Sequence, residues 1–124
     1  DERVNRTRKI FSEIGYQGID LNTDEFYNDI SSSIERGGKD DTGFGRQLTA
    51  ILGSENRLDK VKAIKAQTLI IHGKEDPLIR VKNAYKTKKL IDNSKLIIIS
   101  DMRHLIEIPV FDQFKNELLK HLNS

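Results

Sequence analysis

The chain has 124 residues, enough for one modest hydrophobic core, so we expect one domain or part of one. Its 21 basic and 19 acidic residues are interspersed and leave a net charge of +2, which argues against a nucleic-acid-binding surface. Cysteine is absent, which excludes disulfides, thiolate metal sites and a cysteine nucleophile, and the apolar runs are too short to span a membrane.

The first third of the sequence predicts two helices. One face of the first helix, which Gly15 can end, carries Val4, Ile10, Phe11 and Ile14. Asn22 or Thr23 can cap the second helix, because their side chains accept hydrogen bonds from the first free backbone N–H groups. Apolar residues recur every four positions along it: Phe26, Ile30 and Ile34. Gly37 and Gly38 are expected to stop it.

Residues 39–45 form a polar, glycine-punctuated segment that we predict to be a loop and the main internal boundary of the chain. Asp40 and Asp41 lie together in this loop, but no other candidate ligands flank them, so we predict neither a metal site nor a bound cofactor. A third helix is expected around Leu48, Ile51 and Leu52, followed by a short amphipathic turn that includes Leu58, Val61 and Ile64.

The second half predicts a strand–helix–strand–helix order. The β-branched runs 68–72 and 96–99 are typical of buried strands, and residues 81–91 between them have helical spacing. A crossover of this length implies a parallel, right-handed unit. Pro109 suits the first turn of a closing helix, whose inward face is predicted to carry Phe111, Phe114, Leu118 and Leu122. Two strands leave both sheet edges unpaired, so this half-sheet needs a partner.

Two side chains stand directly after the predicted strands. Asp76 follows the first strand, after Gly73, which can turn the chain, and before Pro77, which fixes the backbone. His104 follows the second strand. Because the carboxyl ends of parallel strands share one edge of a sheet, these side chains could meet and exchange a proton, as in a Ser-His-Asp site. The alternative is that Asp76 only caps a turn.

Other polar residues have simpler interpretations. We expect His72 to be a hydrogen-bonded histidine at a strand end and Glu107 to be a solvated loop residue. His121 is predicted at the surface of the last helix. Ser54 and Ser100 lack the flanking glycines of a nucleophile turn, so neither is expected to be a nucleophile.

The second half of the sequence resembles the C-terminal half of an α/β-hydrolase fold enzyme, in particular the group of aclacinomycin methylesterase and proline iminopeptidase-like proteins. The segments that carry the resemblance are Arg46 to Leu52, Thr68 to Leu78, Lys95 to Ile99 and Met102 to Leu105. Three residues depart from the family pattern: Gln67 replaces a proline before the strand, and Asp101 and Arg103 replace glycines near the histidine. Arg103 could alter the loop or approach the substrate.

The resemblance implies a partial α/β-hydrolase fold, with residues 1–45 as the end of a helical cap and residues 46–124 as the C-terminal half of the core. It implies that Asp76 and His104 are the second and third members of a Ser-Asp-His triad in a carboxylic-ester hydrolase, amides, haloalkanes and epoxides being alternative substrates. The cap would help to form an apolar pocket, with Phe26, Tyr27, Phe44 and Leu48. The nucleophile and oxyanion hole would lie in an N-terminal half that this sequence lacks, so the chain alone is expected to be inactive.

Two hypotheses therefore compete with an enzyme fragment that acts on a small ester. The chain could be a non-catalytic doubly wound α/β binding module, with Asp76 and His104 purely structural. It could also associate with itself, as a homodimer formed through the exposed sheet edge or a swapped helix. We expect a cytoplasmic protein that is a fragment of a longer chain, with no nucleic-acid or membrane partner.

Overall fold

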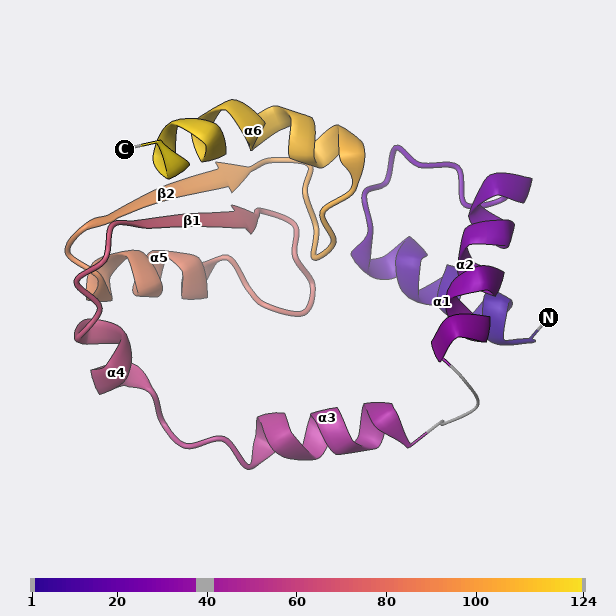
Figure 1. Ribbon diagram of the computed structural model, residues 1–124, viewed down its shortest axis with the longest axis horizontal. Helices are drawn as coiled ribbons and strands as arrows, with labels where there is room; N and C mark the ends of the chain where they lie inside the picture. The colour runs from indigo at the N-terminus through magenta and orange to yellow at the C-terminus, as the bar shows by residue number, and fades with distance from the viewer. Residues whose placement is uncertain (1, 38–41, 124) are drawn as a thin grey trace.

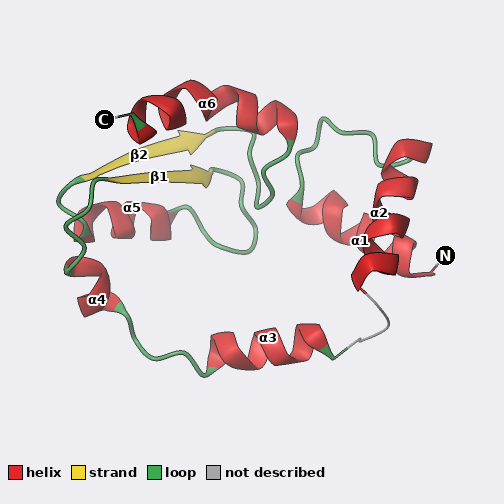
Figure 2. Ribbon diagram, in the orientation of Figure 1, coloured by secondary structure: helices red, strands yellow, loops and turns green. Residues whose placement is uncertain are grey.

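The computed structural model describes residues 2–37 and 42–123 of the protein. Within these ranges helices and strands follow one another as the sequence predicts (Figures 1 and 2). The elements are α1 (Glu2–Ile14), α2 (Asp24–Gly37), α3 (Gly43–Leu52), α4 (Leu58–Lys62), β1 (Thr68–Gly73), α5 (Lys82–Leu90), β2 (Ser94–Ile99) and α6 (Ile108–Leu122).

The two strands pair in parallel, as expected. Their register runs from Thr68 opposite Ser94 to Gly73 opposite Ile99, so both strands end level with each other. Helix α5 contacts both strands, and α6 contacts β2. Figure 1 shows α5 and α6 on opposite faces of the strands, which gives three layers. The α/β fold class is therefore confirmed, and the carboxyl ends of the strands open toward α1.

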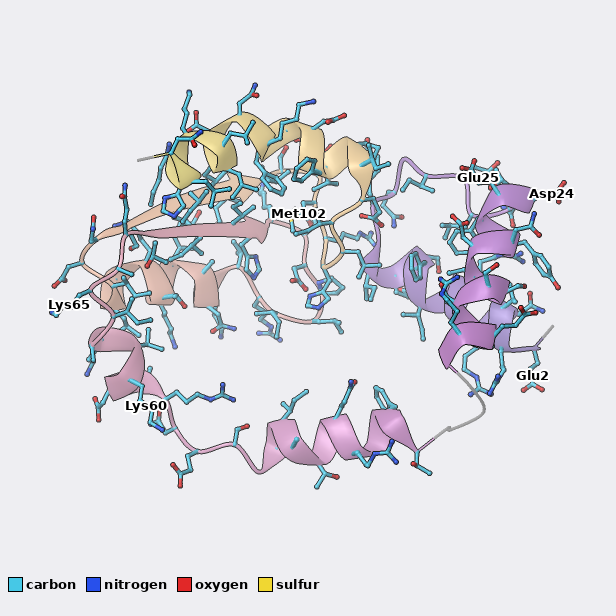
Figure 3. The ribbon with its side chains drawn as sticks, viewed as in Figure 1. Glu2, Asp24, Glu25, Lys60, Lys65 and Met102 are labelled. Atoms are coloured by element: carbon cyan, nitrogen blue, oxygen red, sulfur yellow. The ribbon has the colours of Figure 1, made fainter. Side chains whose placement is uncertain are left out.

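The main core lies between the strands and α6. Ile99, Met102, Val110 and Phe114 form a buried cluster, with Tyr16, Ile71, Ile97 and Leu118 packed against it. Figure 3 shows Met102 just beyond the strand ends, below α6. The loop that follows β2 therefore contributes to the core as well as to the surface.

The inward face of α6 differs from the predicted one. Val110 is fully buried and Phe114 is 3% exposed, whereas Phe111 is 41% exposed and Leu122 is 69% exposed. The prediction was therefore wrong for Phe111 and Leu122. In a helix with 3.6 residues per turn, Phe111 lies roughly 100° around the axis from Val110 and Leu122 roughly 120°, so both leave the buried stripe.

Truncating Phe114 is expected to destabilise the fold. Phe114→Ala removes a buried ring from the main core and should lower the free energy of unfolding by about 3 kcal/mol, as measured by urea denaturation. Phe111→Ala removes an identical side chain from a partly exposed position of the same helix, outside the buried stripe. It serves as the matched control. Equal losses in the two variants would contradict this account of the α6 face.

The first two helices pack on each other, and Phe11 and Phe26 meet edge to face at 5.4 Å between ring centroids. Of the two predicted caps, Thr23 is the one used, because its Oγ1 accepts a hydrogen bond from Phe26 N at 3.1 Å. Val4 is buried as expected, but Ile10 is exposed, which corrects the predicted apolar face of α1.

Helix α3 begins earlier than predicted and stands apart from the sheet. It includes Gly43, Phe44 and Gly45, which were expected in the loop 39–45. Its apolar side chains are exposed, Phe44, Leu48, Ile51 and Leu52. Figure 1 shows α3 away from both strands. An amphipathic helix gains most of its stability by burying its apolar face, so α3 presents a surface that is suited to a further packing partner.

Candidate active site

The structure brings together the two residues predicted at the strand ends. Asp76 lies in the turn after β1, His104 lies in the loop after β2, and His104 Nδ1 is 2.9 Å from Asp76 Oδ2. A carboxylate only accepts hydrogen bonds, so Nδ1–H donates and Nε2 is left as the free basic nitrogen of the neutral ring. The Asp76 side chain is 5% exposed and that of His104 is 37% exposed. A shielded carboxylate therefore orients a histidine that solvent or a ligand can reach.

The same carboxylate also shapes its own turn. Asp76 Oδ1 accepts hydrogen bonds from Leu78 N at 2.8 Å and Ile79 N at 2.9 Å. Asp76 therefore caps its turn and also binds His104. Its Oδ1 accepts the two backbone hydrogen bonds of the turn, and its Oδ2 faces the histidine. Burial opposes ionisation and would raise the pKa of Asp76. The hydrogen bonds from Ile79, His104 and Leu78 outweigh it, so the pKa lies below its ordinary value of 3.8.

This lowered pKa makes stability depend on pH. The folded state binds a proton on Asp76 less tightly than the unfolded state does. The ionised Asp76 carboxylate therefore stabilises the fold, and this effect is fully present above pH 3.8. The effect is lost as the pH falls from there through the lower folded pKa. We expect the difference in unfolding free energy between the wild type and Asp76→Asn to shrink below about pH 4 in urea titrations. A difference that stays constant between about pH 6 and pH 2 would contradict this assignment.

A second histidine lies beside the carboxylate. His72 Nδ1 is 2.8 Å from Gly73 O, which can only accept, so Nδ1 carries the proton. His72 Nε2 is buried, 3.9 Å from Asp76 Oδ2, and has no hydrogen-bond partner within the described parts of the chain. His72 was expected to be fully hydrogen-bonded, and only its Nδ1 is.

The loop that carries His104 is attached to the end of α1. His104 N and Leu105 N donate to Ile14 O at 2.8 and 3.2 Å, and Arg103 Nη1 donates to Glu13 O at 2.6 Å. Sequence reasoning missed this attachment. The unusual Arg103 beside the histidine was a signal, but nothing in the sequence indicated that its partner was a backbone carbonyl near residue 13.

Glu107 and Asp101 also bind structural partners. Glu107 Oε1 accepts a hydrogen bond from Tyr16 N at 2.9 Å, and its Oε2 is buried. The prediction of a solvated Glu107 was therefore wrong, because the segment after α1 covers it. Both oxygens of Asp101 lie 3.0 Å from Gln113 Nε2, which joins the loop to α6.

A shallow hollow of about 260 Å³ opens at the candidate site. It is lined by Ile71, His72, Gly73, Asp76, Ile79, Met102, His104 and Ile106. The residues that were expected to form an apolar pocket do not line this hollow: Phe26, Tyr27, Phe44 and Leu48. Phe26 instead packs against α1. Ile79 and Ile106, which line the hollow, are exposed. The hollow thus joins one acid–base pair to an apolar surface.

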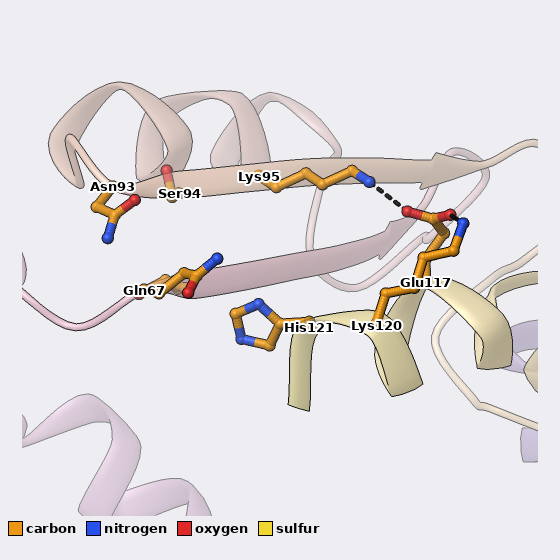
Figure 4. Close-up of a pocket in the computed structure, with 8 residues that line it drawn as sticks. Gln67, Asn93, Ser94, Lys95, Glu117, Lys120 and His121 are labelled. Carbon is orange, nitrogen blue, oxygen red and sulfur yellow. Dashed lines mark hydrogen bonds and ion pairs between the residues drawn. The ribbon is translucent and has the colours of Figure 1, made fainter. Parts of the chain in front are cut away.

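Another hollow, of about 270 Å³, lies at the opposite ends of the strands (Figure 4). Glu117 pairs there with Lys120 and Lys95, which lower its pKa to about 2. His121, expected at the surface, is partly buried and lines this hollow. Neither Ser54 nor Ser100 lines either hollow.

In residues 2–37 and 42–123, no three His, Cys, Asp or Glu side chains gather as a metal site would require. Asp40 and Asp41 lie outside the described residues. The helices in these ranges are also too short or too polar to cross a membrane.

Comparisons with known proteins support the fold. No family model matches the chain. Over 63 residues, 51% of this chain and 22% of the relative, it is 35% identical to 2-hydroxy-6-oxo-6-(2'-aminophenyl)hexa-2,4-dienoic acid hydrolase from Metapseudomonas resinovorans. The narrower resemblance to the aclacinomycin methylesterase group is not confirmed.

Solved structures match nearly the whole chain. A meta-cleavage product hydrolase from Pseudomonas fluorescens IP01 superposes with a TM-score of 0.68 and 21% identity, over 97% of this chain and 45% of that one. A serine hydrolase involved in carbazole degradation superposes with a TM-score of 0.65 and 22% identity, over 98% of this chain and 47% of that one. The chain thus spans less than half the length of these structures, and its fold is part of an α/β-hydrolase fold.

Proposed function

We propose that this chain is the Asp/His half of a serine-type α/β-hydrolase. The observation that carries the proposal is the 2.9 Å contact between His104 Nδ1 and Asp76 Oδ2 at level strand ends, in a chain with this fold. In the proposed division, residues 1–45 are the end of a cap, and residues 46–124 are the C-terminal half of the core. The serine and the oxyanion-hole donors would belong to an N-terminal half outside this chain.

In this proposal His104 Nε2 takes the proton of the serine hydroxyl while the serine oxygen bonds to the substrate's acyl carbon. His104 then gives the proton to the leaving group as the bond to that group breaks. Water then attacks the acyl carbon and gives its proton to His104. His104 returns the proton to the serine oxygen as the acid is released. Asp76 holds the ring by Nδ1 and stabilises the imidazolium, for which its shielded, ionised carboxylate is suited.

The proposed substrates are carboxylic esters with an apolar part. The apolar residues around the hollow, such as Ile79 and Ile106, support this. A second class is favoured by the curated relative, whose name describes a hydrolase of a 6-oxo dienoic acid. In both classes a serine would attack a carbonyl carbon, so the same two residues would serve.

The structure also supports a covering partner. The apolar residues of α3 are exposed. The two-stranded sheet has two unpaired edges, and a sheet of this size is only marginally stable in water. We propose that the N-terminal half of the hydrolase pairs with this sheet and covers the exposed surface. A second copy of the chain is the alternative occupant.

Complementation tests the proposal. We expect this chain alone to show no turnover of p-nitrophenyl esters or of a 6-oxo dienoic acid above background, because it lacks a nucleophile. Addition of the N-terminal half, encoded upstream, should restore turnover of one of these substrates. An upstream sequence without a strand–Gly-x-Ser-x-Gly–helix segment, together with concentration-dependent dimers in light scattering, would instead support a self-associating, non-catalytic module.

A further inference from the structure

The C-terminal end of α1 accepts hydrogen bonds from the loop that carries His104, in addition to one from Gln17 Nε2 to Ser12 O at 3.0 Å and one from Gly15 N to Phe11 O at 2.8 Å. The last four carbonyl groups of a helix have no partners within the helix. Arg103 Nη1 donates to Glu13 O at 2.6 Å and to Ser12 O at 3.3 Å. His104 N donates to the next carbonyl, Ile14 O, at 2.8 Å. A guanidinium at this position is favourable, because the partial negative charge of the helix dipole lies there.

We propose that Arg103 is a positioning residue that sets where His104 stands by tying its backbone to α1. Within the described part of the chain, the His104 ring makes one side-chain hydrogen bond, to Asp76, and it is 37% exposed, so packing constrains it little. The backbone of His104 must therefore be held for the ring to stay in place. Arg103, the adjacent residue, supplies the charged bonds that hold it.

A contact on the other side of His104 supports the same attachment. Glu107 Oε1 accepts from Tyr16 N at 2.9 Å, so the segment that follows α1 is bound three residues after the histidine. The loop is thus tied to residues 12–16 both before and after His104. A displacement of α1 would therefore displace His104, which links the first helix to the candidate site.

The geometry does not favour a substrate-binding role for Arg103. Its guanidinium is directed at carbonyls of α1, and Arg103 is not one of the residues that line the hollow at His104. The expectation that Arg103 alters the loop thus agrees with the structure better than the expectation that it approaches a ligand.

Amide hydrogen exchange on this chain tests the attachment without any need for activity. Arg103→Met keeps the length of the side chain and removes its donors. We expect the amides of His104 and Leu105 to exchange about tenfold faster, while the amides of β1 and β2 stay protected. Arg103→Lys keeps one charged donor and should restore part of the protection. Arg36→Met removes an exposed arginine from α2 and should change neither amide.

The catalytic consequence rests on the proposed function and is measured separately in the complemented enzyme. Arg103→Met should lower kcat by about 10-fold to 100-fold while KM stays within about twofold, because the base is misplaced and the hollow is unchanged. Arg103→Lys should recover part of kcat. A purely structural role would instead lower the amount of folded enzyme without changing kcat per folded molecule.

Unchanged exchange at His104 and Leu105 in Arg103→Met would overturn the inference, whatever the enzyme does. If that variant fails to fold, Arg103→Lys decides: faster exchange at these two amides in a protected sheet supports the attachment, and full protection with unchanged kcat overturns it. If His104→Ala leaves turnover intact, the proposed function fails while the exchange result still stands.

Discussion

Replacement of His104 by alanine is expected to lower kcat/KM of the complemented enzyme by about 10⁴-fold. Among the described residues, the variant loses the one imidazole that lies at hydrogen-bond distance from Asp76 and is also exposed to a ligand. His72 cannot substitute, since its Nε2 is buried and faces the same carboxylate. Initial rates with a chromogenic ester measure the effect.

Two variants sharpen this test. Asp76→Asn keeps an oxygen to accept the bonds from Leu78 and Ile79, so the turn survives, but an amide group replaces the oxygen that faces His104. It should lower kcat by a similar factor, because the ring then loses the partner that sets its tautomer. His121→Ala removes a histidine at the opposite end of the strands and should leave kcat within about twofold. If His104→Ala retains more than about a tenth of wild-type activity, the proposed acid–base role is wrong.

The elements that the sequence predicted well are those that depend on local pattern. The runs 68–72 and 96–99 are short, apolar and β-branched, and both are strands in the structure. Pro109 lies in the first turn of α6, where its missing N–H costs nothing. The start of α3 was missed because Gly43 and Gly45 are poor helix formers, so the pattern indicated a loop.

The candidate site could be predicted only in part, for a physical reason. Asp76 and His104 follow strands, and a parallel sheet brings strand ends to one edge, so their meeting depends on topology alone. The attachment of Arg103 to Glu13 joins residues far apart in the sequence through a backbone carbonyl. Every residue has such a carbonyl, so no residue pattern can mark this partner. The partly buried Glu107 was missed for the same reason, because Tyr16 binds it through a backbone N–H.

The second large effect is expected at Gly73, the last residue of β1. A Cβ atom on Gly73 would lie 2.1 Å from Arg103 O and 2.3 Å from Met102 O. Both atoms belong to backbone, and this stretch is held on two sides: Glu75 N donates to Met102 O, and Arg103 binds α1. Neither carbonyl can retreat without breaking bonds that position His104. The glycine is thus required by close approach of two backbone segments.

Gly73→Ala should therefore lower the free energy of unfolding by about 4 kcal/mol or more, beyond the usual cost of overpacking, since the strand end or the His104 loop must move. Urea denaturation of the complemented protein measures the loss. Gly37→Ala is the matched control: within residues 2–37 and 42–123, no atom lies within 4 Å of its Cβ position at the end of α2. It should leave stability unchanged or raise it by less than about 1 kcal/mol. A Gly73→Ala variant as stable as this control would show that the loop after β2 is free to shift, and the tight placement of His104 against Asp76 would then have no structural basis.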